Sequence, residues 1–171
     1  GIPYRTIPGN RYPTAAYFTR GTGKDVNARY TEDHEVWEAM QDRVKYKFET
    51  ARTLVPKPYI ELDGSGTEIG IVAFGSTEAA ILEARDQLRE RHGIHADFMR
   101  VRALPCPAEV DEFLGNHRVN YVVELNRDGQ LHQILKVEFP QHATKMVSLA
   151  HLDGLPLTAR WVRESILAEE V

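Results

Sequence analysis

The chain has 171 residues and a formal net charge of −4 at pH 7, a length that fits one main domain with an appendage. Its mild acidity argues against a main role in binding nucleic acid, and no run of residues reaches the ~18 apolar positions of a membrane-spanning helix. The single cysteine, Cys106, excludes an internal disulfide and an iron–sulfur cluster held by this chain alone, and it favours a cytoplasmic location.

Residues 1–30 mix proline and glycine with aromatic residues. Pro3, Pro8 and Pro13 interrupt regular structure, yet a disordered linker is normally poor in aromatic residues. We therefore expect an extended arm that packs on a neighbouring domain or subunit. The chain begins with Gly1 and not with Met. This is what we expect of a piece cut from a longer parent protein.

Residues 33–54 carry apolar side chains three and four positions apart, which predicts an amphipathic helix. Thr31 or Asp33 can cap its start, and Pro56 and Pro58 end it. Residues 1–57 are thus predicted to form an arm and a connecting helix, and residues 58–171 an α/β domain.

After Pro58, strand and helix patterns alternate. Strands are predicted at residues 59–62, 68–74, 98–104, 118–125 and 145–149, and helices at about 77–92, 108–114 and 130–137 and after Thr158. This alternation predicts a three-layer α/β sandwich around a mostly parallel sheet of about five strands. Only a four-residue turn links the first two strands, so we expect these two to pair antiparallel and the sheet to be mixed.

Gly75, Ser76 and Thr77 lie where a strand becomes a helix, and free backbone N–H groups at such a start can bind a phosphate. No glycine-rich dinucleotide or phosphate-loop motif accompanies them, so a chain-turning and capping role is favoured over a ligand site. Residues 21–24 resemble the end of a phosphate loop, but Phe18 occupies the position of the required glycine.

The seven histidines form no metal-binding spacing, so we predict no metal site. Cys106 precedes a predicted helix, whose N-terminus lowers a thiol pKa. An enzyme that uses Cys106 as a nucleophile is therefore one hypothesis, although a lone cysteine is more often a small buried apolar residue.

The polar loop after the fourth predicted strand holds the strongest site candidates. Ligands and partners of open α/β sheets bind outside the carboxyl ends of the strands. Glu124, Asn126, Gly129 and Gln130 lie at such an end. The alternative is a polar loop that only caps the next helix, and the residues leave both interpretations open.

Several short segments together resemble a known family. Residues 122–126 with 129–131 match an E-x-N…G-Q-L segment, and residues 153–158 match a closing D-G-x-P-L-T turn. They resemble the α chain of the 2-oxoacid:ferredoxin oxidoreductases, the 2-oxoglutarate type in particular. The other matching segments, in the same order as in the family, are residues 1–9, 30–33, 43–58, 71–76 and 102–107, whereas residues 18–27 fit the family less well.

The resemblance implies the C-terminal domain of the α chain, with a fold like that of the transketolase C-terminal domain. Such an enzyme converts a 2-oxoacid, CoA and oxidised ferredoxin to acyl-CoA, CO₂ and reduced ferredoxin. It uses thiamine diphosphate with Mg²⁺, held between another α-chain domain and the β subunit, and a 4Fe–4S cluster on cysteines elsewhere. The resemblance therefore implies no catalytic residue and no bound cofactor in this chain.

The partners implied are the β subunit and the rest of the α chain, with hetero-oligomer or homodimer contacts, while ferredoxin and CoA act on the whole enzyme. Residues 1–30 and 124–130 are the predicted contact segments, with Gly75 and Ser76 as further candidates. The alternative function is a stand-alone ligand-binding or regulatory domain for CoA or a nucleotide. Its site would lie at residues 75–77 and 126–130.

Overall fold

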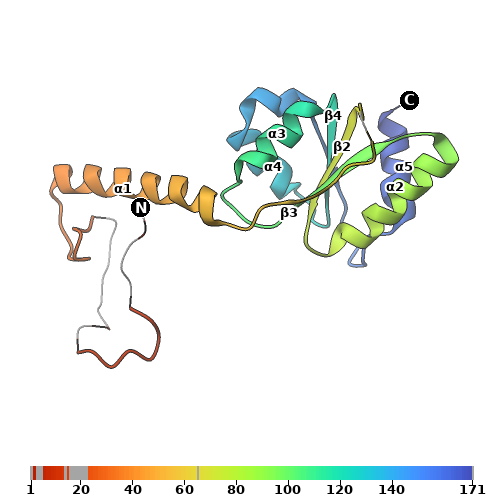
Figure 1. Cartoon of the computed structure of the whole chain (residues 1–171). Helices are drawn as coiled ribbons and strands as arrows, with labels where there is room; N and C mark the ends of the chain where they lie inside the picture. Colours follow the sequence, from red (N-terminus) through yellow and green to blue (C-terminus); the bar gives the residue numbers. More distant parts are fainter. Residues whose placement is uncertain (1, 3–5, 14, 16–22, 65, 171) are drawn as a thin grey trace. The chain divides into compact units, whose positions relative to one another are not determined.

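The computed structural model describes residues 2, 6–13, 15, 23–64 and 66–170. Contacts between residues divide the chain into two compact units, Gly1–Val55 and Pro56–Val171. Both units are drawn in Figure 1, and each is described by itself. The limits expected from the sequence, 1–57 and 58–171, stay a prediction. Within the stretch expected to form the arm, residues 1, 3–5, 14 and 16–22 lie outside the described residues, and with them the first two positions of the phosphate-loop-like segment 21–24.

The first unit contains one long helix, α1 (His34–Leu54), as predicted. The carboxylate of Asp33 caps it by accepting hydrogen bonds from the N–H groups of Glu35 and Val36, at 3.0 and 3.1 Å. The helix ends where Val55 adopts an extended backbone before Pro56. No residue of α1 is buried.

The second unit is built on a five-stranded sheet, visible edge-on in Figure 1. The strands lie in the order β1-β3-β2-β4-β5, and all neighbours are parallel except β1 and β3. The prediction of a mixed, mostly parallel sheet is confirmed. The strands are β1 (Tyr59–Glu61), β2 (Ile69–Phe74), β3 (Ala96–Val101), β4 (Val119–Glu124) and β5 (Met146–Ala150).

Two details of the predicted sheet are wrong. β1 pairs with β3, Tyr59 opposite Arg100, and not with β2, which follows it in sequence. Because β2 is already paired with β3 and β4, neither of its edges is free for β1. The third predicted strand also ends early: Leu104 lies outside β3 and is 49% exposed.

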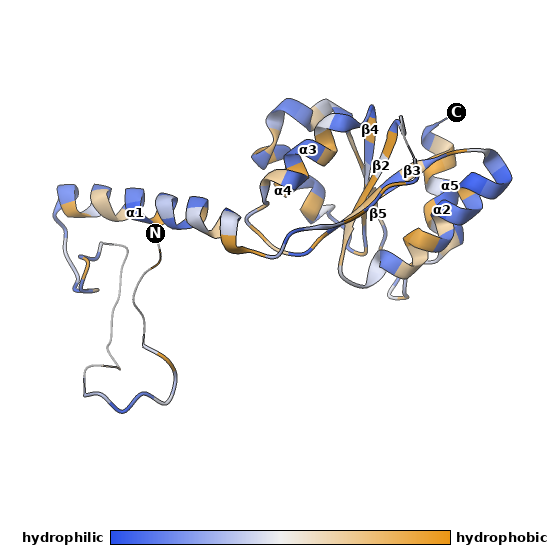
Figure 2. Ribbon diagram, viewed as in Figure 1, coloured by the Kyte–Doolittle hydropathy of each residue, from blue (hydrophilic) through white to orange (hydrophobic). Residues whose placement is uncertain are grey.

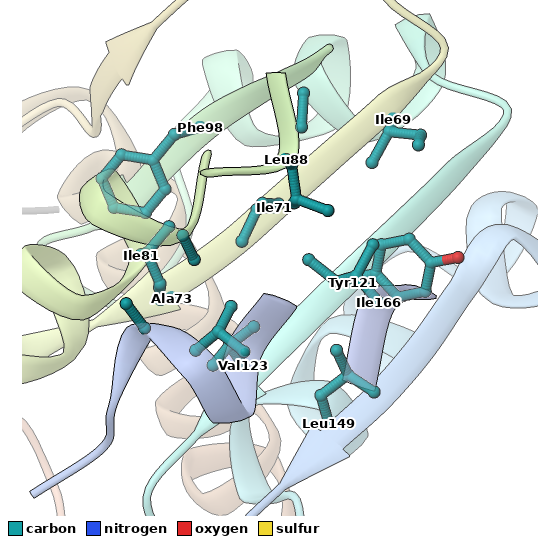
Figure 3. Close-up of a cluster of buried hydrophobic side chains, with 14 of the residues drawn as sticks. Ile69, Ile71, Ala73, Ile81, Leu88, Phe98, Tyr121, Val123, Leu149 and Ile166 are labelled. Atoms are coloured by element: carbon teal, nitrogen blue, oxygen red, sulfur yellow. The ribbon is translucent and has the colours of Figure 1, made fainter. Parts of the chain in front are cut away.

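Helices cover both faces of the sheet. α2 (Glu78–His92) and α5 (Ala159–Glu169) pack on one face, where Ile71, Phe98 and Tyr121 meet Leu88 and Ile166 in the cluster shown in Figure 3. α3 (Ala108–Asn116) and α4 (Gln130–Glu138) pack on the other face. Figure 2 shows hydrophobic and hydrophilic residues alternating along these helices, so the predicted three-layer sandwich is confirmed. Two short 3₁₀ segments, η1 (Gly75–Thr77) and η2 (Pro140–Lys145), join the elements.

A buried arginine fastens the edge strand β1 to the body of the domain. The guanidinium of Arg85, on α2, is almost fully buried. Its Nε donates to the carbonyl of Ala96 at 2.7 Å, and its Nη1 donates to the Glu61 carboxylate at 2.8 Å. The hydrogen bond from Arg85 lowers the pKa of Glu61 below its ordinary value of 4.5.

This pair predicts a dependence of stability on pH. A lowered folded-state pKa means that Glu61 stabilises the fold above its unfolded pKa and loses that contribution as the pH falls through the folded pKa. Glu61→Gln should therefore lower the free energy of unfolding at pH 7, and the difference from wild type should shrink below roughly pH 4. Urea unfolding at pH 7 and pH 3 measures this, with exposed Glu90→Gln as control, and an equal loss at both pH values would contradict it.

Candidate functional site at the carboxyl edge of the sheet

The strand order creates a crevice between β2 and β4. The chain leaves β2 toward β3 on one side, and it leaves β4 toward β5 on the other, although β2 and β4 are neighbours. The connections at the carboxyl ends of these two strands therefore diverge. Such a switch point is where open α/β sheets bind ligands and partners.

A cavity of about 330 Å³ lies at this edge. It brings together two of the candidate residues, Gly75 after β2 and Gln130 at the start of α4. Among its described lining residues, Arg102 alone carries a formal charge, and Phe74, Leu104 and Ile134 are large hydrophobic residues that are 40–49% exposed. The volume is near the lower end of the range of small-molecule pockets, roughly 300–1,000 Å³, so the site offers a small, mostly apolar hollow.

Glu124 is the best-defined polar group at the edge, and it is fully buried at the end of β4. Its Oε2 accepts a hydrogen bond from the N–H of Leu131 at 2.7 Å, and its Oε1 accepts one from the N–H of His132 at 2.9 Å. The side-chain amide of Asn126 donates to the same carboxylate at 2.8 Å. The carboxylate thus accepts hydrogen bonds from N–H groups in the first turn of α4 that have no partner within the helix. Its negative charge also lies at the positive end of the helix dipole.

The rest of the loop is held by equally local contacts. The Asn126 side-chain oxygen accepts from the N–H groups of Asp128 and Gln130, at 3.2 and 3.3 Å. Gly129 has a left-handed backbone, φ 61°, and a Cβ there would lie 2.6 Å from the Ser148 hydroxyl. These bonds match the helix-capping interpretation of residues 124–130; their role as contact or ligand residues stays a prediction.

The other candidate turn differs from expectation in one respect. Thr77 stands at the start of α2, but its hydroxyl donates to the carbonyl of Phe74 at 2.9 Å and caps no helix N–H. The chain enters α2 through the 3₁₀ turn η1, in which Gly75 has a left-handed φ of 66°. The expectation of a side-chain cap from Ser76 or Thr77 is therefore wrong, and Ser76 is exposed outside the cavity lining.

Cys106 is 1% exposed and packs in the hydrophobic cluster beneath α3 and α4. Such burial in apolar surroundings disfavours the reactive thiolate, so the hypothesis of a Cys106 nucleophile finds no support. Among the described residues, no group of three or more His, Cys, Asp or Glu side chains could hold a metal ion. In the same part of the chain, no helix has the length and apolar character needed to cross a membrane.

The sequence analysis missed a buried polar cluster at the amino ends of β3 and β4. His117 Nε2 lies 3.1 Å from Asp97 Oδ2, and His117 Nδ1 lies 2.7 Å from the carbonyl of Phe113. Asn120, alongside, donates to the carbonyl of Leu114 at 3.1 Å. All three polar residues are at most 6% exposed. Asp97 and Asn120 each break an apolar run in the sequence, which is the signal that could have revealed them.

Comparison of the chain with known proteins identifies a curated relative. Over 155 residues the chain is 32% identical to subunit alpha of 2-oxoacid:ferredoxin oxidoreductase 2 from Aeropyrum pernix, which covers 88% of this chain and 24% of that protein. No protein-family model matches. The chain therefore spans about a quarter of the length of this curated relative.

Solved structures share the fold. A 2-oxoglutarate:ferredoxin oxidoreductase from Magnetococcus marinus, solved with 2-oxoglutarate, coenzyme A and succinyl-CoA bound, aligns with 95% of this chain and 28% of its own (TM-score 0.76, 22% identity). A split-gene transketolase, an inactive β4 tetramer, aligns with 64% of this chain and 40% of its own (TM-score 0.52, 24% identity). The resemblance inferred from the sequence is thus confirmed: this chain is similar to one segment of the α subunit of a 2-oxoacid:ferredoxin oxidoreductase.

Proposed function

We propose that this chain is a structural and assembly domain of the α subunit of a thiamine diphosphate-dependent 2-oxoacid:ferredoxin oxidoreductase, and that it is not a catalyst by itself. The whole enzyme would form acyl-CoA and CO₂ from a 2-oxoacid and CoA while it reduces ferredoxin. One observation carries the proposal: the sequence match covers 88% of this chain but only 24% of the relative. The chain thus corresponds to one part of a larger subunit.

The residues that the structure describes do not fit the cofactors of such an enzyme. A 4Fe–4S cluster needs four thiolates, and the chain has one cysteine, which is buried. Thiamine diphosphate with Mg²⁺ needs oxygen ligands that converge on the metal ion, and among the described residues no group of three or more His, Cys, Asp or Glu side chains could hold one. The Glu124 carboxylate already accepts hydrogen bonds from Leu131, His132 and Asn126. Other polypeptide, namely the rest of the α chain and the β subunit, would supply these sites.

The carboxyl edge of the sheet is the surface through which the domain would contact that polypeptide. Phe74, Leu104 and Ile134 are 44, 49 and 40% exposed there, and they line the small cavity together with Gly75 and Gln130. Clustered exposed apolar residues mark protein–protein contacts. Residues 1–30 would add a second contact segment. Ferredoxin and CoA would act on the assembled enzyme, in the cytoplasm.

The test compares the chain alone with the assembled enzyme. The purified chain should reduce no ferredoxin with 2-oxoglutarate, pyruvate or another 2-oxoacid, and calorimetry should detect no tight thiamine diphosphate binding. Co-expressed with the remainder of the α subunit and the β subunit, it should co-purify with them. Leu104→Glu should weaken that association, whereas Leu152→Glu, 61% exposed on another loop, should not. Turnover by the chain alone would overturn the proposal.

The second candidate, a stand-alone domain that binds CoA or a nucleotide, is favoured by the cavity itself, because it joins Gly75 to Gln130 at the switch point. Calorimetric titration with CoA and with nucleotides separates the two functions. Saturable micromolar binding that Gln130→Ala abolishes would support the second candidate. Absence of binding, together with co-purification of the subunits, would support the first.

A further inference from the structure

A second hollow, the α2–α5 groove, has a volume of about 680 Å³ and lies between α2 and α5, which cover the same face of the sheet (Figure 1). It shares no described lining residue with the cavity at the carboxyl edge. One wall consists of α2 residues four positions apart, which share one side of the helix: Ala79, Glu83, Gln87 and Arg91. The other wall, at the start of α5, contains Thr158, Arg160 and Arg163.

Positive charge dominates the α2–α5 groove. Three arginines and one glutamate are the charged residues of its described lining, although the whole chain has a net charge of −4. Within the described part of the chain, the exposed side chains of Arg91 and Arg160 form no ion pair or hydrogen bond. The other arginines of the second unit each pair with a carboxylate or, for Arg102, donate to a backbone carbonyl. Two guanidinium groups without a counter-charge thus border one hollow, where they attract an anion.

Arg163 is held in place at the same groove. Its side chain is 15% exposed. Its Nη1 donates to Gln87 Oε1 at 2.5 Å, and its Nη2 donates to the carboxylate of Glu164, outside the groove lining, at 2.9 Å. Gln87 in turn donates to the Glu83 carboxylate at 2.9 Å, so the one carboxylate of the lining already accepts a hydrogen bond. A guanidinium has five N–H donors, and Arg163 therefore keeps donors for an anion while its side chain is already positioned.

The chemistry of the groove favours phosphate over other anions. Guanidinium groups bind phosphate through paired N–H···O bonds. A phosphate ester carries up to about two negative charges and three acceptor oxygens, so it can engage more than one arginine, whereas a carboxylate has one charge and two oxygens. The volume lies within the range of small-molecule pockets, roughly 300–1,000 Å³. The short side chains of Ala79 and Ala80 leave room for an organic body beside the arginines.

We propose that the α2–α5 groove binds a small phosphorylated molecule, and that Arg91, Arg160 and Arg163 hold its phosphate groups. The inference goes beyond the proposed function and does not depend on it, because the groove is separate from the carboxyl-edge cavity. The groove is open to solvent, so we expect a dissociation constant on the order of 0.1–1 mM for inorganic pyrophosphate.

NMR titration of the isotope-labelled 171-residue chain tests the site. The probes are inorganic pyrophosphate and ribose 5-phosphate, and ribose is the uncharged control. Both phosphate probes should shift the amide signals of residues 79–91 and 157–163 in a saturable way that salt weakens, and ribose should not. Shifts that cluster in another part of the chain, or no shift at about 10 mM pyrophosphate, would overturn the proposal.

Substitutions test the arginines. Arg91→Gln and Arg160→Gln should each weaken pyrophosphate binding about tenfold, because each removes a charged hydrogen-bond donor. Arg127→Gln is the matched control, since Arg127 is exposed but pairs with Asp128 outside the groove lining, and it should leave the binding unchanged. All three arginines are exposed, so the fold should persist in each variant. Pyrophosphate binding that tolerates both groove substitutions would contradict the proposal.

Two further measurements separate the groove from other sites. CoA and nucleotides carry phosphate groups and should also enter the groove, but Gln130→Ala should leave that binding intact, whereas the second candidate function predicts its loss. The proposed function rests on co-purification of the subunits, so the two can fail separately. A hexaglutamate peptide that binds the groove as tightly as pyrophosphate would show that the arginines recognise an acidic polypeptide, and it would rule out the assignment to a phosphorylated small molecule.

Discussion

Replacement of Glu124 by alanine should lower the free energy of unfolding by about 3 kcal/mol, because buried N–H groups that bond to a charged acceptor lose it. The N–H groups of Leu131 and His132 both donate to this carboxylate, which is fully buried. Alanine leaves these donors at the first turn of α4 without a partner and opens a small cavity. The loss therefore combines a missing helix cap with unsatisfied buried donors.

Glu124→Gln separates charge from hydrogen bonding. The amide keeps one acceptor oxygen but turns an NH₂ group toward a backbone donor, so its effect should lie between wild type and alanine. Chemical unfolding of all variants gives the comparison, and Glu90→Ala, at an exposed position on α2, controls for loss of a surface carboxylate. If Glu124→Ala behaved like Glu90→Ala, the carboxylate would have no capping role.

The parts of the fold that the sequence predicts are those set by neighbouring residues. The apolar run of residues 69–74 forms a covered strand, Gly93 ends α2 with a left-handed φ of 66°, and Thr158 caps α5 by accepting the N–H of Trp161 at 3.2 Å. Each follows from a local rule on burial, backbone freedom or capping. The spacing of these signals also suffices to predict the three layers.

The parts that the sequence does not predict depend on distant residues. β1 is linked to β2 by a short turn but pairs with β3, more than thirty residues away, because β2 lies inside the sheet between β3 and β4. The cavity likewise needs three segments, near residues 74, 102 and 130, that meet only after folding. Residues 124–130 could be selected as polar residues at a strand end, but only the structure shows that the Glu124 oxygens are used by the loop's own helix.

The second large effect on the free energy of unfolding is expected at Gly70. It lies in the buried interior of β2, and a Cβ there would stand 2.5 Å from Asn120 Oδ1, 2.8 Å from a ring carbon of Phe113 and 3.0 Å from His117 Nδ1. Asn120 and His117 belong to the buried polar cluster, Phe113 packs in the hydrophobic core, and none of the three side chains is more than 4% exposed. Gly70→Ala should therefore cost about 2–3 kcal/mol of unfolding free energy through overpacking. Gly115 lies on α3, and a Cβ there would meet only the His142 ring, at 3.3 Å. Gly115→Ala should therefore cost far less.

A double-mutant cycle identifies the cause of that cost. Asn120 Oδ1 is buried and, among the described residues, has no hydrogen-bond partner, so its removal loses no bond from that atom and frees the space that a Cβ on residue 70 would enter. Asn120→Ala still loses its bond to the Leu114 carbonyl and should cost roughly 1–2 kcal/mol alone. The double variant should be more stable than the sum of the single losses by about 1 kcal/mol. Additive losses would mean that Phe113 and His117, and not Asn120, exclude a side chain from this point of the sheet.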